Sequence, residues 1–315
     1  MRAFVTGGMG FLGAHLVSGL LRQGHHVHVF DQGPASTDGS GPEGSVMLRG
    51  DLLDVNSICS AVSEAKPDVV FHLAAVVNLD RSLDIADACL RVNVLGTLNL
   101  LRALEDQELE SFVLPSSVEV YGNGSIPFRE DQAAAPPSPY AVSKLAAEQL
   151  ALSLYRSKGF PAVVVRIATA YGPSQPNHRL IPSLIGAFSR GERPALSNPD
   201  LSRDFLYVDD VVEGLVLAAG CQAGSGEIIN LGDEQTYTIK QVAETVRNLM
   251  AVDLAPRYGA MPARANEARV WASSNEKALK LLGWKPRTVL REGLQKTISW
   301  YCPQLNTTSS TVTNQ

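Results

Sequence analysis

The sequence lacks the features of membrane, secreted and nucleic-acid-binding proteins. None of its apolar runs approaches the ~20 residues that a membrane-spanning helix needs. Lysine and arginine (27) are outnumbered by aspartate and glutamate (32), and the formal net charge of −5 argues against a protein that coats nucleic-acid phosphates. Hydrophobic residues still make up 45% of the 315 residues, which excludes disorder for most of the chain.

Cysteine is scarce, and its spacing fits neither a disulfide framework nor a metal site. Four cysteines lie far apart and form no Cys-x-x-Cys pair: Cys59, Cys89, Cys221 and Cys302. We expect free thiols in a reducing compartment. His26 and His28 share one face of an expected strand without further ligands, so we expect no metal. A strand follows Met1 directly, which predicts a cytoplasmic protein without a signal peptide.

Short β-branched runs alternate with helical patterns in the first half of the chain. Nearly continuous apolar runs, typical of strands buried on both faces, occur at 2–6, 26–30, 46–49, 69–73, 112–114 and 162–167. Helical periodicity separates them at 11–23, 55–66, 87–105 and 140–158. This alternation predicts an α/β protein with a Rossmann-type, doubly wound parallel sheet.

Prolines become frequent after residue 167, where the texture of the sequence changes. Helices are expected at 180–190, 208–219 and 239–250, and a strand at 227–231. We therefore expect a Rossmann domain over residues 1–170, to which the chain can return within 200–235. A smaller C-terminal α/β cap is expected mainly over 171–303, followed by a disordered polar tail over 304–315.

A glycine-rich turn follows the first expected strand and opens the first helix, in the run Thr6-Gly-Gly-Met-Gly-Phe-Leu-Gly13. Its glycines allow a tight turn and let the backbone approach a pyrophosphate, whose charge the helix N-terminus stabilises. Asp31 ends the second strand 18 residues after Gly13. Its carboxylate can bind both ribose hydroxyls and repels a 2′-phosphate, so the pattern predicts NAD rather than NADP.

Later strand ends are expected to meet the same ligand. Asp51 and Leu52, after the third strand, can hydrogen-bond the adenine edge and pack on its face. Small residues follow His72 at the edge of the sheet where ligands bind. His72 itself is expected to be a buried histidine with hydrogen-bond partners.

Tyr140 and Lys144 lie four residues apart in an expected helix and therefore share one face of it. An ammonium beside a phenol lowers the phenol's pKa, so Tyr140 is expected to exchange a proton near neutral pH. Lys144 can also hold the nicotinamide ribose. Ser117 ends the fifth strand, where its hydroxyl can face the same ligand.

Together these motifs resemble the extended short-chain dehydrogenases/reductases, the nucleotide-sugar epimerases and dehydratases. The resemblance runs from Arg2 to about Trp300. Besides the glycine-rich run, the segments that carry it are Asp51-Leu52, His72-Leu-Ala-Ala75, Val92-Asn-Val-Leu-Gly-Thr97, Ser116-Ser-Val-Glu-Val-Tyr-Gly122, Pro139-Tyr-Ala-Val-Ser-Lys144, Tyr171-Gly-Pro173, Arg203-Asp-Phe205 and Gly283-Trp-Lys-Pro286.

The resemblance implies NAD in the first domain and a nucleoside-diphosphate sugar under the cap. Tyr140 would exchange a proton with a sugar hydroxyl that Ser117 holds, and Lys144 would tune Tyr140. The implied cofactor-binding residues are Gly7, Gly10, Phe11, Leu12, Gly13, Asp31, Asp51, Leu52, Leu73, Ala74, Ala75, Asn93, Tyr140 and Lys144. The implied substrate-binding residues are Ser117, Val118, Thr169, Arg203 and Arg264.

The two arginines would neutralise the substrate diphosphate, which suits the bidentate guanidinium group. Arg269 competes with Arg264 for this role. A structural pair with Asp204 or Asp209 is the alternative for Arg203. Thr169 stands where many family members carry an asparagine that contacts the substrate phosphates.

The residues after Ser117 bear on the reaction. Family 4,6-dehydratases have Thr-Asp-Glu where this chain has Ser117-Val118-Glu119, and their Asp expels the C6 hydroxyl while the Glu removes the C5 proton. Val118 cannot donate a proton, whereas Glu119 is available as a base. A 4-epimerase needs no such acid, because the transient ketone turns and takes the same hydride back on its other face.

We therefore expect an NAD-dependent nucleotide-sugar 4-epimerase. A variant dehydratase or a decarboxylase that uses Glu119 stays open. So does an NAD(P)H-dependent 4-ketoreductase, which residues 264–267 and 283–286 also resemble but Asp31 disfavours. A non-catalytic NAD-binding protein is least favoured, because the Ser, Tyr and Lys are intact. Family members commonly pair through the helices expected at 87–105 and 140–158, so a homodimer is expected.

Overall fold

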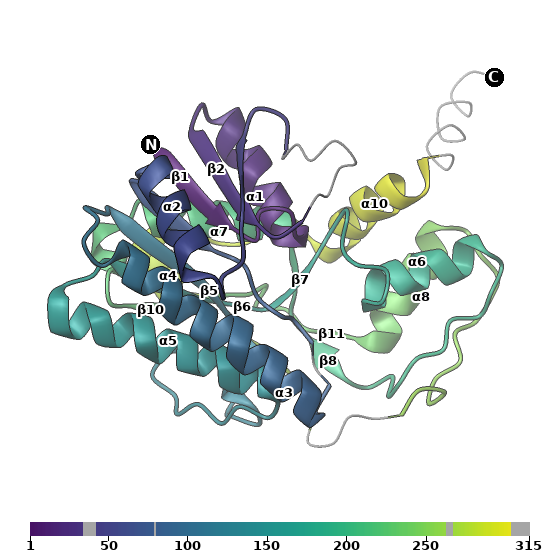
Figure 1. Ribbon diagram of the computed structural model, residues 1–315. Helices are drawn as coiled ribbons and strands as arrows, with labels where there is room; N and C mark the ends of the chain where they lie inside the picture. Colours follow the sequence, from purple (N-terminus) through teal and green to yellow (C-terminus); the bar gives the residue numbers. More distant parts are fainter. Residues whose placement is uncertain (34–41, 79, 263–266, 304–315) are drawn as a thin grey trace.

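Seven parallel strands form the central sheet among the residues that the computed structural model describes, 1–33, 42–78, 80–262 and 267–303 (Figure 1). Their order across the sheet is β10-β6-β5-β4-β1-β2-β3. Their bounds are β1 Arg2–Thr6, β2 His26–Asp31, β3 Val46–Arg49, β4 Val69–His72, β5 Ser111–Ser117, β6 Ala162–Ile167 and β10 Ile228–Leu231. The expected tail over 304–315 lies outside the described residues.

The strand order reverses at β1. From there the chain first runs outward through β2 and β3, then returns to add β4, β5 and β6 on the other side. All neighbouring strands are parallel, so their carboxyl ends lie at one edge of the sheet. This confirms the doubly wound Rossmann-type sheet, whose ligand crevice lies where the order reverses.

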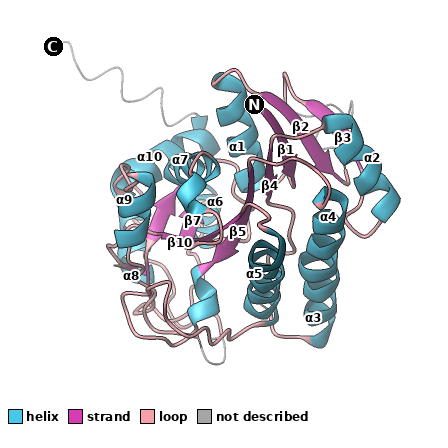
Figure 2. Ribbon diagram, turned by 90° about the vertical axis from the view of Figure 1, so that its left-hand side faces the viewer, coloured by secondary structure: helices cyan, strands magenta, loops and turns pink. Residues whose placement is uncertain are grey.

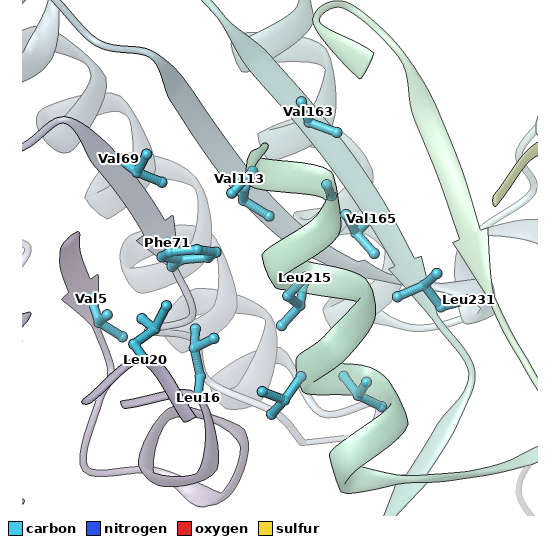
Figure 3. Packing of buried hydrophobic residues seen from close by; sticks show 14 of the residues in the cluster. Val5, Leu16, Leu20, Val69, Phe71, Val113, Val163, Val165, Leu215 and Leu231 are labelled. Carbon is cyan, nitrogen blue, oxygen red and sulfur yellow. The ribbon is translucent and has the colours of Figure 1, made fainter. Parts of the chain in front are cut away.

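Helices cover both faces of the sheet (Figure 2). On one face, α1 (Phe11–Arg22) and α7 (Val208–Ala219) form a hydrophobic core with the strands. Figure 3 shows Leu16, Leu20 and Leu215 of these helices over strand residues such as Phe71 and Val165. On the other face lie α2 (Val55–Ala65), α4 (Gly96–Leu104) and α5 (Pro139–Lys158).

Buried layers on both faces explain why the strands are apolar at consecutive positions. Phe4 and Val70 point into the core under α2, α4 and α5, whereas their neighbours Val5 and Phe71 point into the core under α1 and α7. Successive strand residues face opposite sides, so every position of such a strand is removed from water.

A third core lies between α6, α8 and α10. The further elements of the second half are the helices α6 Leu180–Ser189, α8 Ile239–Leu249, α9 Glu276–Leu282 and α10 Leu290–Tyr301, the strand pairs β7 Thr169–Tyr171 with β9 Phe205–Tyr207 and β8 Ser202–Arg203 with β11 Tyr237–Thr238, and the short η3 Gln222–Gly224. After α6 and α7 the chain returns to the sheet through β10, which pairs with β6.

Two predicted elements need correction, while the others agree with the structure to within one residue at either end. The single helix expected at 87–105 is α3 (Leu83–Cys89), the π-helical segment η1 (Leu90–Leu95) and α4. It begins earlier because the Ser82 side chain caps α3 by accepting a hydrogen bond from the Ile85 amide. The strand expected at 112–114 extends over Ser111–Ser117, because Pro115, Ser116 and Ser117 continue the pairing with β6.

In the part of the chain that the structure describes, no helix is long and apolar enough to cross a membrane. The same residues contain no cluster of three or more histidine, cysteine or acidic side chains suited to a metal ion. All four cysteines lie in described segments and are free thiols.

Candidate active site

The glycine-rich turn between β1 and α1 is shaped for a phosphate. Gly7 has φ +70°, and a Cβ there would lie 2.5 Å from the Ala74 amide nitrogen, so only glycine fits. A Cβ on Gly13 would overlap the Gly7 carbonyl oxygen. Gly10 is exposed and is the N-cap residue of α1. It has no side chain that could occupy the free amides at the start of the helix. The first amides of α1 are therefore open to a pyrophosphate.

Asp31 lies at the carboxyl end of β2, beside this turn. Its Oδ2 accepts a hydrogen bond from the Met9 amide at 3.1 Å, which fixes the carboxylate against the loop. The carboxylate repels a 2′-phosphate and suits the ribose hydroxyls, as the sequence predicts. Together with the glycine turn, this donor and acceptor set fits NAD.

Asp51 and Leu52 follow β3 at the same edge of the sheet. The Asp51 carboxylate accepts a hydrogen bond from the Leu53 amide at 2.8 Å, and Leu52 is buried. Asn99 of α4 donates to the Leu52 carbonyl at 3.0 Å. The segment is thus held rigidly where an adenine contact is predicted.

His72 closes β4 and has hydrogen-bond partners on both ring nitrogens. Its Nδ1 lies 2.7 Å from Thr6 Oγ1 and its Nε2 lies 2.9 Å from Thr97 Oγ1. Burial, together with the nearby Lys144 charge, lowers the pKa of His72 to about 3. The expectation of a buried, hydrogen-bonded histidine is confirmed, and the ring is neutral.

Asn93 lies in the π-helical segment η1 and connects two parts of the site. Its Oδ1 accepts from the Val76 amide at 2.7 Å, and its Nδ2 donates to the Val76 carbonyl and to Ser143 Oγ at 3.0 and 2.9 Å. Ser143 in turn donates to the Tyr140 carbonyl at 2.7 Å. Asn93 therefore holds the chain after β4 against α5, and π-helical turns are frequent at functional sites.

Tyr140 and Lys144 lie in the first turns of α5 and are both almost completely buried. Ser117, the last residue of β5, is half-buried, and its Oγ accepts from the Glu119 amide at 3.1 Å. The Ser117 hydroxyl also acts on the Tyr140 phenol as a hydrogen-bond partner. The structure thus brings the Ser, Tyr and Lys predicted from the sequence into one region.

The expected lowering of the Tyr140 pKa needs correction. Burial raises the pKa of Tyr140 and the nearby Glu119 carboxylate raises it further, while Arg179 and the Ser117 hydroxyl oppose them. Burial lowers the pKa of Lys144 itself to about 8, against the opposing charge of Glu148. The sequence pattern contains the i, i+4 spacing but not the desolvation of both groups.

Val118 and Glu119 lie in the short 3₁₀ segment η2 (Val118–Tyr121) that follows Ser117. Val118 is fully buried in a small apolar cluster that includes Phe128 and Ala168. Glu119 is also buried, and Ser138 Oγ donates to its Oε1 at 2.8 Å. The acid of the dehydratase pattern is therefore replaced by a packed apolar side chain, while the Glu of that pattern is present as Glu119.

Arg203 in β8 is buried and has a carboxylate partner. Its guanidinium donates to Glu267 at 2.8 Å, rather than pairing with Asp204 or Asp209, and lies over the Trp271 ring at 4.2 Å. Arg264 lies outside the described residues, and Arg269 is exposed. A substrate diphosphate at Arg203 would thus share the guanidinium with Glu267.

Thr169 begins β7, next to Asp204. Its amide donates to the Asp204 carbonyl at 3.1 Å, but its Oγ1 is buried without a hydrogen-bond partner among the described residues. Asparagine would reach further than this hydroxyl.

Two residues around the site, Ser138 and Arg179, were not predicted from the sequence. Ser138, directly before Pro139, is a recognisable N-cap, since it accepts the Ala141 amide at 3.1 Å. Arg179 carries no such signal: it lies 39 residues after Tyr140, and only the fold places its charge near the phenol while it donates to the Val77 carbonyl at 2.9 Å.

Known proteins share this architecture. A UDP-glucose 4-epimerase of Mycolicibacterium smegmatis is 31% identical over 96% of this chain and 98% of its own. A dTDP-glucose 4,6-dehydratase of Streptomyces antibioticus is 33% identical over 96% of this chain and 92% of its own. The solved Thermus thermophilus UDP-glucose 4-epimerase in complex with NAD superposes with a TM-score of 0.86, at 30% identity, over 96% of this chain and 99% of that one.

The sequence model of the NAD dependent epimerase/dehydratase family matches residues 3–232. That match contains the glycine-rich turn, Asp31 and the Ser, Tyr and Lys. The chain therefore belongs to the NAD-dependent epimerase/dehydratase family, extended short-chain dehydrogenases/reductases that are enzymes acting on nucleotide sugars with NAD as cofactor.

Proposed function

We propose that this enzyme is a nucleotide-diphospho-sugar 4-epimerase. The observation that carries the proposal is Val118, which occupies the place of the dehydratase acid and is buried among apolar side chains. No proton can be donated from it to a leaving C6 hydroxyl. Epimerisation at C4 needs only the removal and return of one hydride and one proton, for which the remaining residues suffice.

NAD⁺, held by the glycine-rich turn and Asp31, would supply the acceptor for the C4 hydride. The Tyr140 Oη takes the proton of the C4 hydroxyl during oxidation and gives it back to the ketone oxygen. Ser117 Oγ holds that oxygen in place. Lys144, charged below a pKa of about 8, would bind the nicotinamide ribose and stabilise negative charge near the phenol.

Retention of the cofactor suits this reaction. The Gly7–Gly13 turn and Asp31 would hold a dinucleotide without a 2′-phosphate, which a 4-epimerase does not consume. A net ketoreductase would instead consume an external reductant, often NADPH. The Asp31 carboxylate disfavours the 2′-phosphate of NADPH.

The substrate we propose is a nucleoside-diphosphate hexose. Relatives are named for UDP-glucose and dTDP-glucose. Arg203 and Arg264 are the proposed diphosphate contacts, with Ser117, Val118 and Thr169 beside the sugar.

A dehydratase or decarboxylase is the second candidate, because of Glu119. Its carboxylate is buried and accepts a hydrogen bond from the Ser138 hydroxyl. It also lies close enough to Tyr140 to raise the phenol's pKa. A buried carboxylate at this point could remove the C5 proton from a 4-ketosugar.

Proton NMR in D₂O distinguishes these reactions. The purified protein is mixed with a panel of nucleotide sugars without added cofactor. We expect a new C4 epimer that contains no deuterium, because the hydride returns internally. A product that has lost water or CO₂ and has gained deuterium would contradict the epimerase. It would indicate the Glu119-dependent reaction instead. Turnover that requires an added 4-ketosugar and NAD(P)H would instead establish a ketoreductase.

We also propose a homodimer, because α3, η1 and α5 leave apolar side chains on their outer surface. Leu83 is 86% exposed, and Leu90, Leu95 and Val142 are each more than 40% exposed. η1 packs beside α5, so these side chains belong to one helical layer. An exposed apolar surface of this kind is typical of a protein interface.

A further inference from the structure

Glu148 and Arg166 form an ion pair that is almost completely removed from water. The Glu148 side chain is 0% exposed and that of Arg166 is 3% exposed. Arg166 Nε donates to Glu148 Oε1 at 3.0 Å, and Nη2 donates to Oε2 at 2.7 Å. Ser116 Oγ donates to the same Oε1. Burying two charges is costly, so a pair of this kind invites a functional explanation.

The ion pair neighbours Lys144 and Ser117, two of the residues proposed to act in catalysis. Glu148 follows Lys144 by four residues on α5, so the two side chains share one face of the helix. Ser116, which donates to Glu148, precedes Ser117 at the end of β5. The carboxylate thus contacts the strand that carries the serine and neighbours the lysine.

Lys144 is a charge in an unfavourable place. Burial disfavours its ammonium, and Glu148 is the group whose charge opposes that effect. The charged and titratable groups packed around Lys144 and Tyr140 are neutral His72 on β4, Arg166 on β6, Cys89 on α3, Glu119 in η2, Arg179 before α6 and Glu148 on α5. Two of these groups are carboxylates. One of them, Glu119, accepts a hydrogen bond from Ser138, the N-cap residue of α5.

We propose that Glu148 is a positioning residue for the reaction, whose buried carboxylate keeps the Lys144 ammonium charged, while Arg166 holds that carboxylate in place. Arg166 performs this role through its two hydrogen bonds and is itself fixed over the Tyr121 ring at 4.6 Å. The inference rests on the proposed use of Lys144 in turnover.

The test is Glu148→Gln, read from the pH profile of kcat/KM for the sugar conversion found in the NMR panel. Loss of the carboxylate charge removes support for the ammonium, so the alkaline limb moves to lower pH. We expect the ratio of kcat/KM at pH 7 to that at pH 8.5 to rise by roughly three- to tenfold over wild type. Glu105→Gln is the matched control, since it removes the exposed ion pair with Lys158 on the same helix.

A folded Glu148→Gln variant whose kcat/KM falls by one factor at every pH would overturn the proposal, because that result describes structural damage alone. Glu148→Gln leaves the Arg166 charge buried and unpaired, so the variant can fail to fold. The double variant Glu148→Gln/Arg166→Met removes both charges and keeps the volume. The same shift of the alkaline limb is expected from it, and an unmoved limb would again overturn the proposal.

A direct titration separates this inference from the proposed function. The ¹³Cε signal of labelled Lys144 reports its protonation without any substrate. We expect it to titrate near pH 8 in wild type and at lower pH in the double variant. A shift in that titration without sugar turnover would leave the electrostatic role intact and remove the epimerase, whereas equal titrations would remove the role.

Discussion

At the scale of single residues, the phenol of Tyr140 lies between opposing influences. Burial and Glu119 raise its pKa, while Arg179 and Ser117 lower it. A phenol that binds its proton this firmly suits a group that returns a proton to a ketone oxygen. Ionisation of the phenol, in contrast, needs support from nearby cations such as Arg179. The proposed proton transfer at Tyr140 therefore depends on charges contributed from α5 and from the start of α6.

Tyr140→Phe removes the oxygen that we propose transfers the proton, while keeping the ring. We expect sugar turnover to fall by about 10²–10⁴-fold, with an unchanged thermal unfolding midpoint. Steady-state kinetics and circular dichroism measure the two quantities. Tyr155→Phe, at a partly exposed position of the same helix, is the control and should keep full activity. Normal turnover by Tyr140→Phe would exclude the catalytic assignment.

A second residue-scale prediction concerns Asp204, which is buried between β8 and β9. Burial raises its pKa to about 7, against a hydrogen bond from the Ser273 amide. A carboxyl whose pKa is higher in the folded state contributes stability at acidic pH, fully present below about 4 and lost as the pH rises through 7.

Asp204→Asn removes that titration. We expect wild type to lose roughly 1–4 kcal/mol more stability than the variant between pH 5 and pH 8. Denaturant unfolding at both pH values measures the difference. Asp233, whose pKa burial also raises to about 7, contributes to the slope of both proteins. Because its charge also raises the pKa of Asp204, the difference between the slopes includes this coupling. Identical slopes would mean that Asp204 is ionised across this range.

At the scale of elements, the start of α5 determines where the catalytic turn lies. Ser138 caps the helix by accepting the Ala141 amide and at the same time donates to Glu119. The Ser138 hydroxyl therefore connects Glu119, in the η2 segment after β5, with the first turn of the helix that carries Tyr140. The geometry of the site depends on this cap as well as on the sheet.

Ser138→Ala should cost about 1–2 kcal/mol of unfolding free energy, because the helix loses its N-cap. Activity is expected to fall as well, since Glu119 loses its hydroxyl partner beside Tyr140. Ser153→Ala on the same helix removes only a local bond to the Leu150 carbonyl and serves as the control. If both variants unfold at the same denaturant concentration, the cap does not stabilise the helix.

At the scale of the whole molecule, the exposed apolar side chains of η1 and α5 predict association of two chains. Leu90→Glu combined with Val142→Glu places charges on this surface without altering a buried residue. Sedimentation velocity should show a dimer for the wild type at micromolar concentration and a monomer for the variant. A wild-type monomer under these conditions would contradict the proposed dimer. A dimer that survives both substitutions would place the interface elsewhere.

The alternation of apolar runs and helical patterns determined most of this fold in advance. Strands buried on both faces leave continuous apolar runs, and the turn at Gly7 can be recognised because its backbone tolerates only glycine. The i, i+4 spacing likewise identified Tyr140 and Lys144, because local helical geometry places such residues on one face. The division near residue 170 remains a prediction from composition.

Only the tertiary structure decided the interactions that join distant parts of the chain. Asn93, in the π-helical segment η1, bonds to Val76 at the other end of a long connection, and the charge of Arg179 reaches Tyr140 only through the fold. The direction of the Tyr140 pKa shift also had to come from the structure, because desolvation depends on what packs around a group and not on its neighbours in the sequence. Local patterns thus fix elements and their faces, whereas burial and long-range charge determine how the site works.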